Sequence, residues 1–140
     1  PEALAIVLRE AKTDIVLAGW NLCINDYLFR QENLDKLRNS GSELARFCVD
    51  INHTLIELNA QRFKEDVLDM ADPVAMAIAL DPSLVTESIT AYTQVETNNG
   101  LAYGAIAVDH IGQSGKKPNA TTIVSIDGPR MKDFIYKLLV

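Results

Sequence analysis

The segment MADPVAMAIALDP, residues 70–82, constrains the fold most strongly because it contains seven consecutive apolar residues, 74–80. The run indicates a buried segment, and it is far shorter than the roughly 20 residues that span a bilayer. Asp72 and Pro73 stand just before it. Aspartate favours the capping position of a helix and proline its first turn, so the sequence predicts a buried helix that begins at this pair.

The carboxylate of Asp72 has two possible roles. As a helix cap it would accept a backbone N–H, a contact worth ~1 kcal/mol. It is also an oxygen donor of the kind that a metal ion binds. Asp66, Asp69 and Asp72 recur at a spacing of three, but they lack the alternating ligands, central glycine and terminal glutamate of a calcium-binding loop. The residues alone favour the cap and leave the metal role open.

Length and composition narrow the class of protein. A chain of 140 residues with 48% hydrophobic and 23% charged residues is typical of one globular domain. The net charge of −6 argues against nucleic acid as a partner, because a phosphate-binding face needs clustered lysine and arginine. No membrane segment is expected. Cys23 and Cys48 lie in apolar-patterned segments, which favours buried free thiols in a reducing compartment, the cytoplasm, over a disulfide.

Helical and strand-like patterns alternate along the chain, which predicts one mixed α/β unit over residues 1–140. Ser42 is expected to cap the longest helix, and Asn99-Gly100 to form a tight hairpin turn. The expected helices cover 1–12, 27–41 and 42–62 and begin again at 72 and 129, and the expected strands cover 14–20, 88–97, 101–111 and 120–126.

The first residues suggest that the chain is part of a longer protein. Pro1 and Glu2 suit the first turn of a helix, but the residue that would cap this helix is missing. Removal of an initiator methionine ahead of proline is the alternative. No glycine-rich phosphate loop, Cys-x-x-Cys pair or His-Glu-x-x-His motif is present. His53 and His110 are expected in ordinary surface or half-buried positions.

Three stretches carry a family resemblance in their order and spacing: PEALAIVLREAKTDIVLAGWNL, MADPVAMAIALDPSLVT and VETNNGLAYGAIAVDHIGQSGKKPNATTIVSID. Together they resemble the C-terminal part of the inosine–uridine type nucleoside hydrolases. In that family an Asp-Pro-Glu-Ala segment opens a helix, and a His-Asp-Pro-like motif precedes an apolar helix. The resemblance covers nearly all 140 residues and implies the C-terminal part of an open sheet flanked by helices, without the N-terminal half.

The resemblance implies an enzyme that hydrolyses the N-glycosidic bond of purine or pyrimidine nucleosides in nucleoside salvage. Its Ca²⁺ is bound by aspartates, and the ribose hydroxyls complete the coordination. Asp72 falls on the family's Asp-Pro aspartate, a calcium ligand. Most of the family's metal-binding aspartates, including the presumed water-activating base, belong to an N-terminal Asp-x-Asp-x-x-x-Asp-Asp motif, which this sequence lacks. No catalytic residue is therefore assigned within the chain, which is expected to be inactive alone and to form a homo-oligomer or associate with the missing half.

One departure from the family concerns the leaving base. Many members place histidine immediately before the Asp-Pro aspartate, and this chain has Ala71, which cannot transfer a proton. The base preference therefore stays open. Phe63 is the only aromatic residue near the end of the preceding helix, and no role is assigned to it. The alternative function is a non-catalytic protein of the same ancestry that binds a partner or a ribose-like ligand.

Overall fold

The computed structural model describes all 140 residues and divides them into two compact units. Unit 1 comprises Pro1–Gly19 and Glu87–Ser125, and unit 2 comprises Trp20–Thr86 and Ile126–Val140. None of the helices combines the length and the apolar character needed to cross a membrane. The mixture of helices with a small, open, mixed sheet is the fold class that the sequence predicts.

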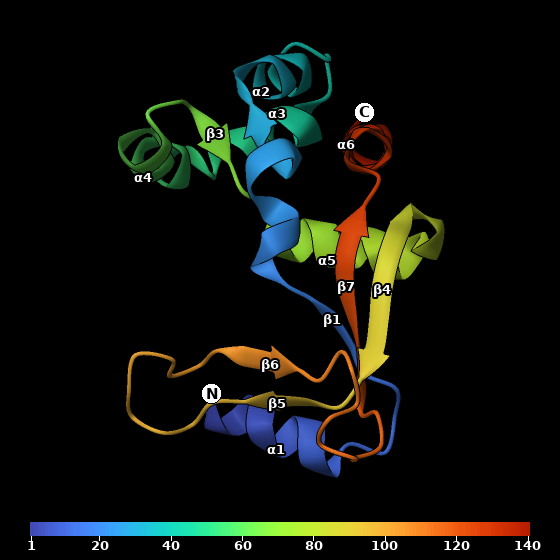
Figure 1. The fold of residues 1–140 in the computed structure, drawn as a ribbon. Coiled ribbons are helices and arrows are strands. Elements are labelled where there is room, and N and C mark those ends of the chain that lie inside the picture. The colour runs from blue at the N-terminus through green and yellow to red at the C-terminus, as the bar shows by residue number, and fades with distance from the viewer. The chain divides into compact units, whose positions relative to one another are not determined.

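Unit 1 contains the three-stranded sheet, whose strand order is β1-β7-β4. Strand β1 (Val16–Ala18) pairs in parallel with β7 (Ala120–Ile126), and β4 (Val85–Ala91) runs opposite to β7 (Figure 1). Helix α1 (Glu2–Glu10) buries Leu8 in a small core with Val95 and Ala120. The predicted strand at 14–20 and the strand at 120–126 are both present, the second with its predicted bounds.

The hairpin of unit 1 differs from the prediction in its turn. Strands β5 (Thr93–Val95) and β6 (Ile106–Val108) pair antiparallel, but the connection is longer than a two-residue turn. The N–H of Gly104 donates to the carbonyl of Glu96 at 2.8 Å, and Gly104 has a φ of +85°. Gly104, at the end of this connection, adopts a left-handed conformation that glycine tolerates because it has no Cβ to clash there. The hairpin prediction is confirmed, and the tight turn at Asn99-Gly100 is wrong.

Unit 2 consists of short helices around a two-stranded ribbon (Figure 1). The ribbon pairs β2 (Phe29–Arg30) antiparallel with β3 (Val67–Leu68). Its helices are α2 (Gln31–Arg38), α3 (Glu43–Asp50), α4 (His53–Phe63), α5 (Ala71–Leu80) and α6 (Gly128–Leu139), with 3-10 turns η1 (Trp20–Cys23), η2 (Asn25–Tyr27) and η3 (Pro82–Leu84). Its fully buried side chains include Leu22, Leu34, Leu37, Val49, Val67, Leu68, Val74, Leu84 and Met131.

The long helix predicted from Ser42 to residue 62 is in fact two helices. Ser42 is the cap, as predicted, because its hydroxyl accepts the N–H of Ala45 at 3.2 Å. The helix then breaks at Asn52, whose side-chain amide donates to the carbonyl of Cys48 at 2.7 Å. That carbonyl is the one to which the backbone N–H of Asn52 would donate in a continuous helix, and this N–H donates to Val49 instead. Asparagine thus competes with the backbone and ends α3.

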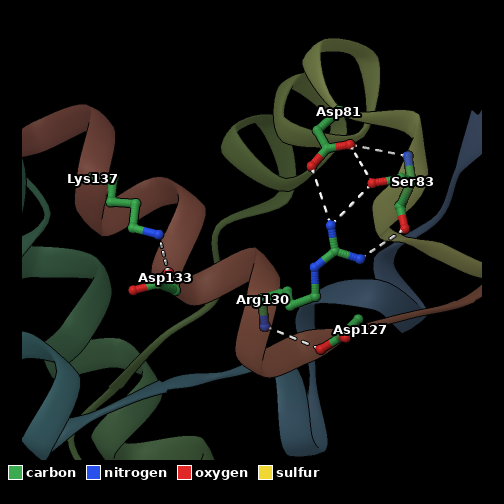
Figure 2. A network of polar contacts seen from close by, with 6 residues as sticks. All are labelled: Asp81, Ser83, Asp127, Arg130, Asp133 and Lys137. Carbon is green, nitrogen blue, oxygen red and sulfur yellow. Dashed lines mark hydrogen bonds and ion pairs between the residues drawn. The ribbon is translucent and has the colours of Figure 1, made fainter.

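A polar network joins the end of α5 to the start of α6 (Figure 2). The Arg130 guanidinium donates to the Ser83 hydroxyl at 3.0 Å and to its carbonyl at 3.2 Å, and it lies 3.5 Å from the Asp81 carboxylate. Asp127 caps α6 by accepting the N–H of Arg130 at 3.1 Å. The carbonyl of Leu84 also accepts the N–H of Asp127 at 2.8 Å. These bonds fix the far end of the helix that carries Asp72.

Candidate functional site

Asp72 is the second residue of α5 and does not cap it. The helix begins at Ala71, its capping residue is Met70, and no side chain hydrogen-bonds to its free N–H groups. The prediction that the carboxylate of Asp72 caps a helix beginning at Pro73 is therefore wrong. The backbone of Asp72 is already helical, although proline disfavours that conformation in the residue before it. The helix start is thus determined by the preceding segment rather than by the Asp-Pro pair.

The Asp72 carboxylate is exposed and has no hydrogen bond or ion pair. It lies in the first turn of α5, where the free N–H groups and the helix dipole favour a negative charge. Carboxylate oxygen is the donor that Ca²⁺ prefers, so Asp72 suits the role of one metal ligand. Ca²⁺ takes six to eight oxygens, however, and no group of three or more His, Cys, Asp or Glu side chains gathers here. Alone, these residues do not form a metal site.

Asp69, three residues earlier, is held on both of its carboxylate oxygens. The indole N–H of Trp20 donates to one oxygen at 2.9 Å, and the Asn59 amide donates to the other at 2.8 Å. The same amide also donates to the carbonyl of Val67 at 3.2 Å. Asn59 is 4% exposed, and a buried amide is stable only when its hydrogen bonds are made. It thereby joins α4 to β3 and to the residue that follows β3.

The charge of Arg62 completes this cluster. Its guanidinium lies 4.7 Å from the centre of the Trp20 ring, within the range of a cation–π contact. Burial by itself would raise the pKa of Asp69. The hydrogen bonds from Asn59 and Trp20, with the positive charge of Arg62, outweigh burial and hold that pKa below its usual value. Asp69 is accordingly an ionised carboxylate that is already fully engaged within the protein.

The charges of both aspartates act on the thiol of Cys23, at the end of η1. Burial, followed by the charges of Asp69 and Asp72, raises the pKa of its thiol to about 11. Because the thiolate is the nucleophile and the metal ligand, Cys23 is inert in both respects at neutral pH. Cys23 is buried, Cys48 is half-buried, and neither forms a disulfide.

An open apolar groove of about 620 Å³ runs past the start of α5. Asp69 and Asp72 lie on its wall, and Ala71 presents a methyl group there. Most of the other lining residues are apolar and come from β3, from the end of α3 and from α4, α5 and α6: Cys48, Ile51, Leu55, Leu68, Met76, Ala77, Ile135, Leu138 and Leu139. The arrangement offers one free carboxylate beside a surface suited to an apolar or aromatic group.

Sequence reasoning missed the contacts of Asp69. Trp20 and Asp69 are 49 positions apart, and no local pattern connects them. Asn59 offered a signal, because it lies four residues after Leu55 on the apolar side of its helix. A polar residue at such a position must find buried partners. Phe63 is half-buried, and its ring lies 5.5 Å from the Arg62 guanidinium.

Comparison with known proteins gives a consistent family match. The model of the inosine-uridine preferring nucleoside hydrolase family matches residues 1–133. The pyrimidine-specific ribonucleoside hydrolase RihA of Citrobacter koseri is 26% identical over 140 residues, which are 99% of this chain and 44% of that protein. RihA of Escherichia coli K12 is 26% identical over 136 residues, 96% of this chain and 43% of that protein. The chain thus spans less than half the length of these relatives.

Solved structures give the same fold. A plant nucleoside hydrolase, PpNRh1, matches with a TM-score of 0.83 and 23% identity, over 99% of this chain and 45% of that one. An inosine-guanosine nucleoside hydrolase matches with a TM-score of 0.80 and 22% identity, over 99% of this chain and 43% of that one. At these identities the match establishes the arrangement of helices and strands rather than a substrate.

Proposed function

Because the chain belongs to the inosine-uridine preferring nucleoside hydrolase family, we propose that residues 1–140 form the C-terminal portion of a ribonucleoside hydrolase domain. The reaction we propose for the whole protein is hydrolysis of the N-glycosidic bond between a purine or pyrimidine base and ribose. The observation that carries this proposal is the family match over residues 1–133, within which Asp72 stands at the start of α5 with its carboxylate free.

Within this function, Asp72 is proposed to supply one carboxylate oxygen to Ca²⁺. A bound Ca²⁺ provides a positive charge that holds the ribose hydroxyls by coordination. Asp72 suits the role because no residue of this chain occupies its carboxylate. We propose that the remaining ligands and the group that activates water come from outside these residues, since no group of three or more His, Cys, Asp or Glu side chains gathers within them. The groove beside Asp72 is wide enough to take an apolar or aromatic face of a ligand.

The exposed apolar surface of unit 2 supports the proposal that this chain binds a protein partner. Large apolar side chains on its helices and at the junction of α3 and α4 are more than half exposed: Leu44, Phe47, Ile51, Leu58, Met76, Leu80 and Leu138. Large exposed apolar patches are typical of interaction surfaces. We propose that it is covered by further hydrolase sequence or by another copy of the chain. The unpaired thiols of Cys23 and Cys48 suit a reducing compartment such as the cytoplasm.

Ala71 is the observation that favours a second candidate function. Its methyl group cannot protonate a leaving base, so a protein of this family that binds ribose or a partner without cleaving a nucleoside also fits. The two functions differ in a direct assay. The full-length gene product should release ribose from inosine or uridine, and the release should stop when a chelator removes Ca²⁺ and resume when Ca²⁺ is restored. Calcium-dependent nucleoside binding without ribose release would contradict the enzymatic function and support the binding function.

Residues 1–140 alone should have no hydrolase activity. One free carboxylate cannot provide the metal ligands, the water-activating base and the ribose contacts together. The measurement is ribose release by the purified 140-residue chain, with the full-length gene product as the positive control. Release by the short chain that disappears in Asp72→Asn would contradict the proposal.

A further inference from the structure

The connection between β3 and α5 is fixed at Asp69. Both oxygens of its carboxylate accept side-chain hydrogen bonds, from Trp20 in η1 and from Asn59 in α4. The Asn59 amide also donates to the carbonyl of Val67 in β3, so one side chain holds both the strand and the residue that follows it. Two separate elements of unit 2, η1 and α4, therefore converge on one residue of a short connection. A connection held in this way has little freedom to reorient.

The next carboxylate along the chain, that of Asp72, is not held by other side chains. Asp72 lies three residues after Asp69, in the first turn of α5, and it has no hydrogen bond or ion pair. Only Met70 and Ala71 lie between them, and the carbonyl of Met70 accepts the first helical N–H, that of Val74, at 3.0 Å. Only two residues thus separate the anchored Asp69 from Asp72, so the anchor restrains the start of the helix that carries Asp72.

We propose that Asp69 is a positioning residue, whose contacts with Trp20 and Asn59 aim the Asp72 carboxylate at a divalent cation. The inference rests on the proposed metal role of Asp72. Loss of a group that orients a metal ligand typically lowers metal affinity 10–100-fold. Asp69 would act one step further away, through the two residues that join it to Asp72, so an effect at the lower end of this range is expected. Asp69 is not itself assigned as a ligand, because each of its oxygens already accepts a strong donor.

Trp20→Phe in the full-length gene product tests the proposal. Phenylalanine keeps an aromatic ring beside Arg62, although a smaller one, and lacks the N–H that binds Asp69. Calcium affinity is expected to fall about 10-fold, and turnover should recover at saturating Ca²⁺ because every ligand is still present. Asp72→Asn should not recover in this way. A role in stability alone would change the unfolding midpoint but not the dissociation constant of Ca²⁺.

Tyr103→Phe is the matched control. It also removes a single aromatic hydrogen-bond donor from a carboxylate, since the Tyr103 hydroxyl donates to Glu2 at 2.8 Å in unit 1. Its calcium affinity should equal that of the unsubstituted protein. If Trp20→Phe proves too unstable to measure, Asp69→Asn serves instead. That change places an amide opposite one of the two donors and should weaken Ca²⁺ binding by a similar factor.

The outcomes separate this inference from the proposed function. Unchanged calcium affinity in Trp20→Phe or its substitute, with weakened binding in Asp72→Asn, overturns the positioning role and leaves the proposed function standing. If neither Trp20→Phe nor Asp72→Asn alters calcium affinity, the metal role of Asp72 fails and the positioning role fails with it. If Asp69→Asn abolishes binding as completely as Asp72→Asn while Trp20→Phe has no effect, Asp69 is a ligand, and the positioning role is wrong.

Discussion

The two ends of α5 carry the same dipeptide, Asp-Pro, in opposite roles. At the far end, the Asp81 carboxylate accepts the Ser83 N–H at 3.1 Å and the Ser83 hydroxyl at 2.6 Å, and Arg130 lies beside it (Figure 2). At the near end, Asp72 has no such partner. A carboxylate used by the fold and a carboxylate left free are therefore separated by one helix.

Backbone conformation explains the difference. Asp81 has φ −132° and ψ 84°, which is outside the helical region and lets its side chain reach the free N–H of the following turn. Asp72 already has helical geometry, and no side chain caps the helix start beside it. The comparison teaches that an Asp-Pro pair indicates a cap only where the aspartate lies outside the helix. The uncommitted carboxylate, rather than the capping one, is the candidate for function.

Exchange of each aspartate for asparagine in the full-length gene product gives the largest expected effect. Asp72→Asn keeps the shape of the side chain but removes its charge, so calcium affinity and turnover should fall by more than roughly 100-fold, beyond the loss typical of a supporting residue. Asp81→Asn, the matched control, should leave both nearly unchanged. Calcium titration and ribose release measure the effect. Full calcium affinity and activity in Asp72→Asn would remove the functional distinction between the two aspartates.

Replacement by alanine should affect protein stability in the opposite order, with the larger loss at Asp81 and the smaller one at Asp72. Asp72→Ala removes an exposed side chain that caps nothing, so the free energy of unfolding should change by no more than about 0.5 kcal/mol. Asp81→Ala removes the cap of η3 and the contact with Arg130 and should destabilise the protein more. Denaturant midpoints of the two variants give the comparison. A larger loss in Asp72→Ala would mean that its carboxylate does support the helix.

The smallest expected effect is on acid stability. The hydroxyl of Ser83, with its backbone N–H and the charge of Arg130, holds the pKa of Asp81 below its ordinary value of 3.8. A lowered folded pKa means that ionised Asp81 stabilises the protein above pH 3.8 and that this contribution is lost as the pH falls through the folded pKa. Asp81→Asn should therefore lose less stability below pH 3.8 than the unsubstituted protein.

The same experiment has an internal check. Ser83→Ala removes the bond that lowers the pKa of Asp81 most, so the pKa should return toward its ordinary value and the acid-dependent loss should shrink. Thermal unfolding followed over the acid range gives both profiles. If Asp81→Asn and Ser83→Ala keep the pH dependence of the parent, other carboxylates account for it.

Local patterns were sufficient for much of the fold. The strand at Ala120–Ile126, the cap at Ser42 and the final helix α6 all follow from short-range rules of burial period, capping and proline placement. The family resemblance was also present in the sequence, because it depends on the order of several motifs rather than on their contacts. These features share one property, namely that neighbouring residues in the chain determine them.

Contacts between distant residues decided the rest. The sequence singled out Asp72, but whether its carboxylate would be occupied depended on where α5 begins, and the structure places that start before the Asp-Pro pair. Asp69 gave no local signal, because its partners are Trp20 and Asn59, 49 and 10 positions away. A hydrogen bond between side chains on separate elements exists only after the chain has folded. The sequence alone therefore determined the family and the candidate carboxylate, whereas only the tertiary structure decided which aspartate is held and which is free.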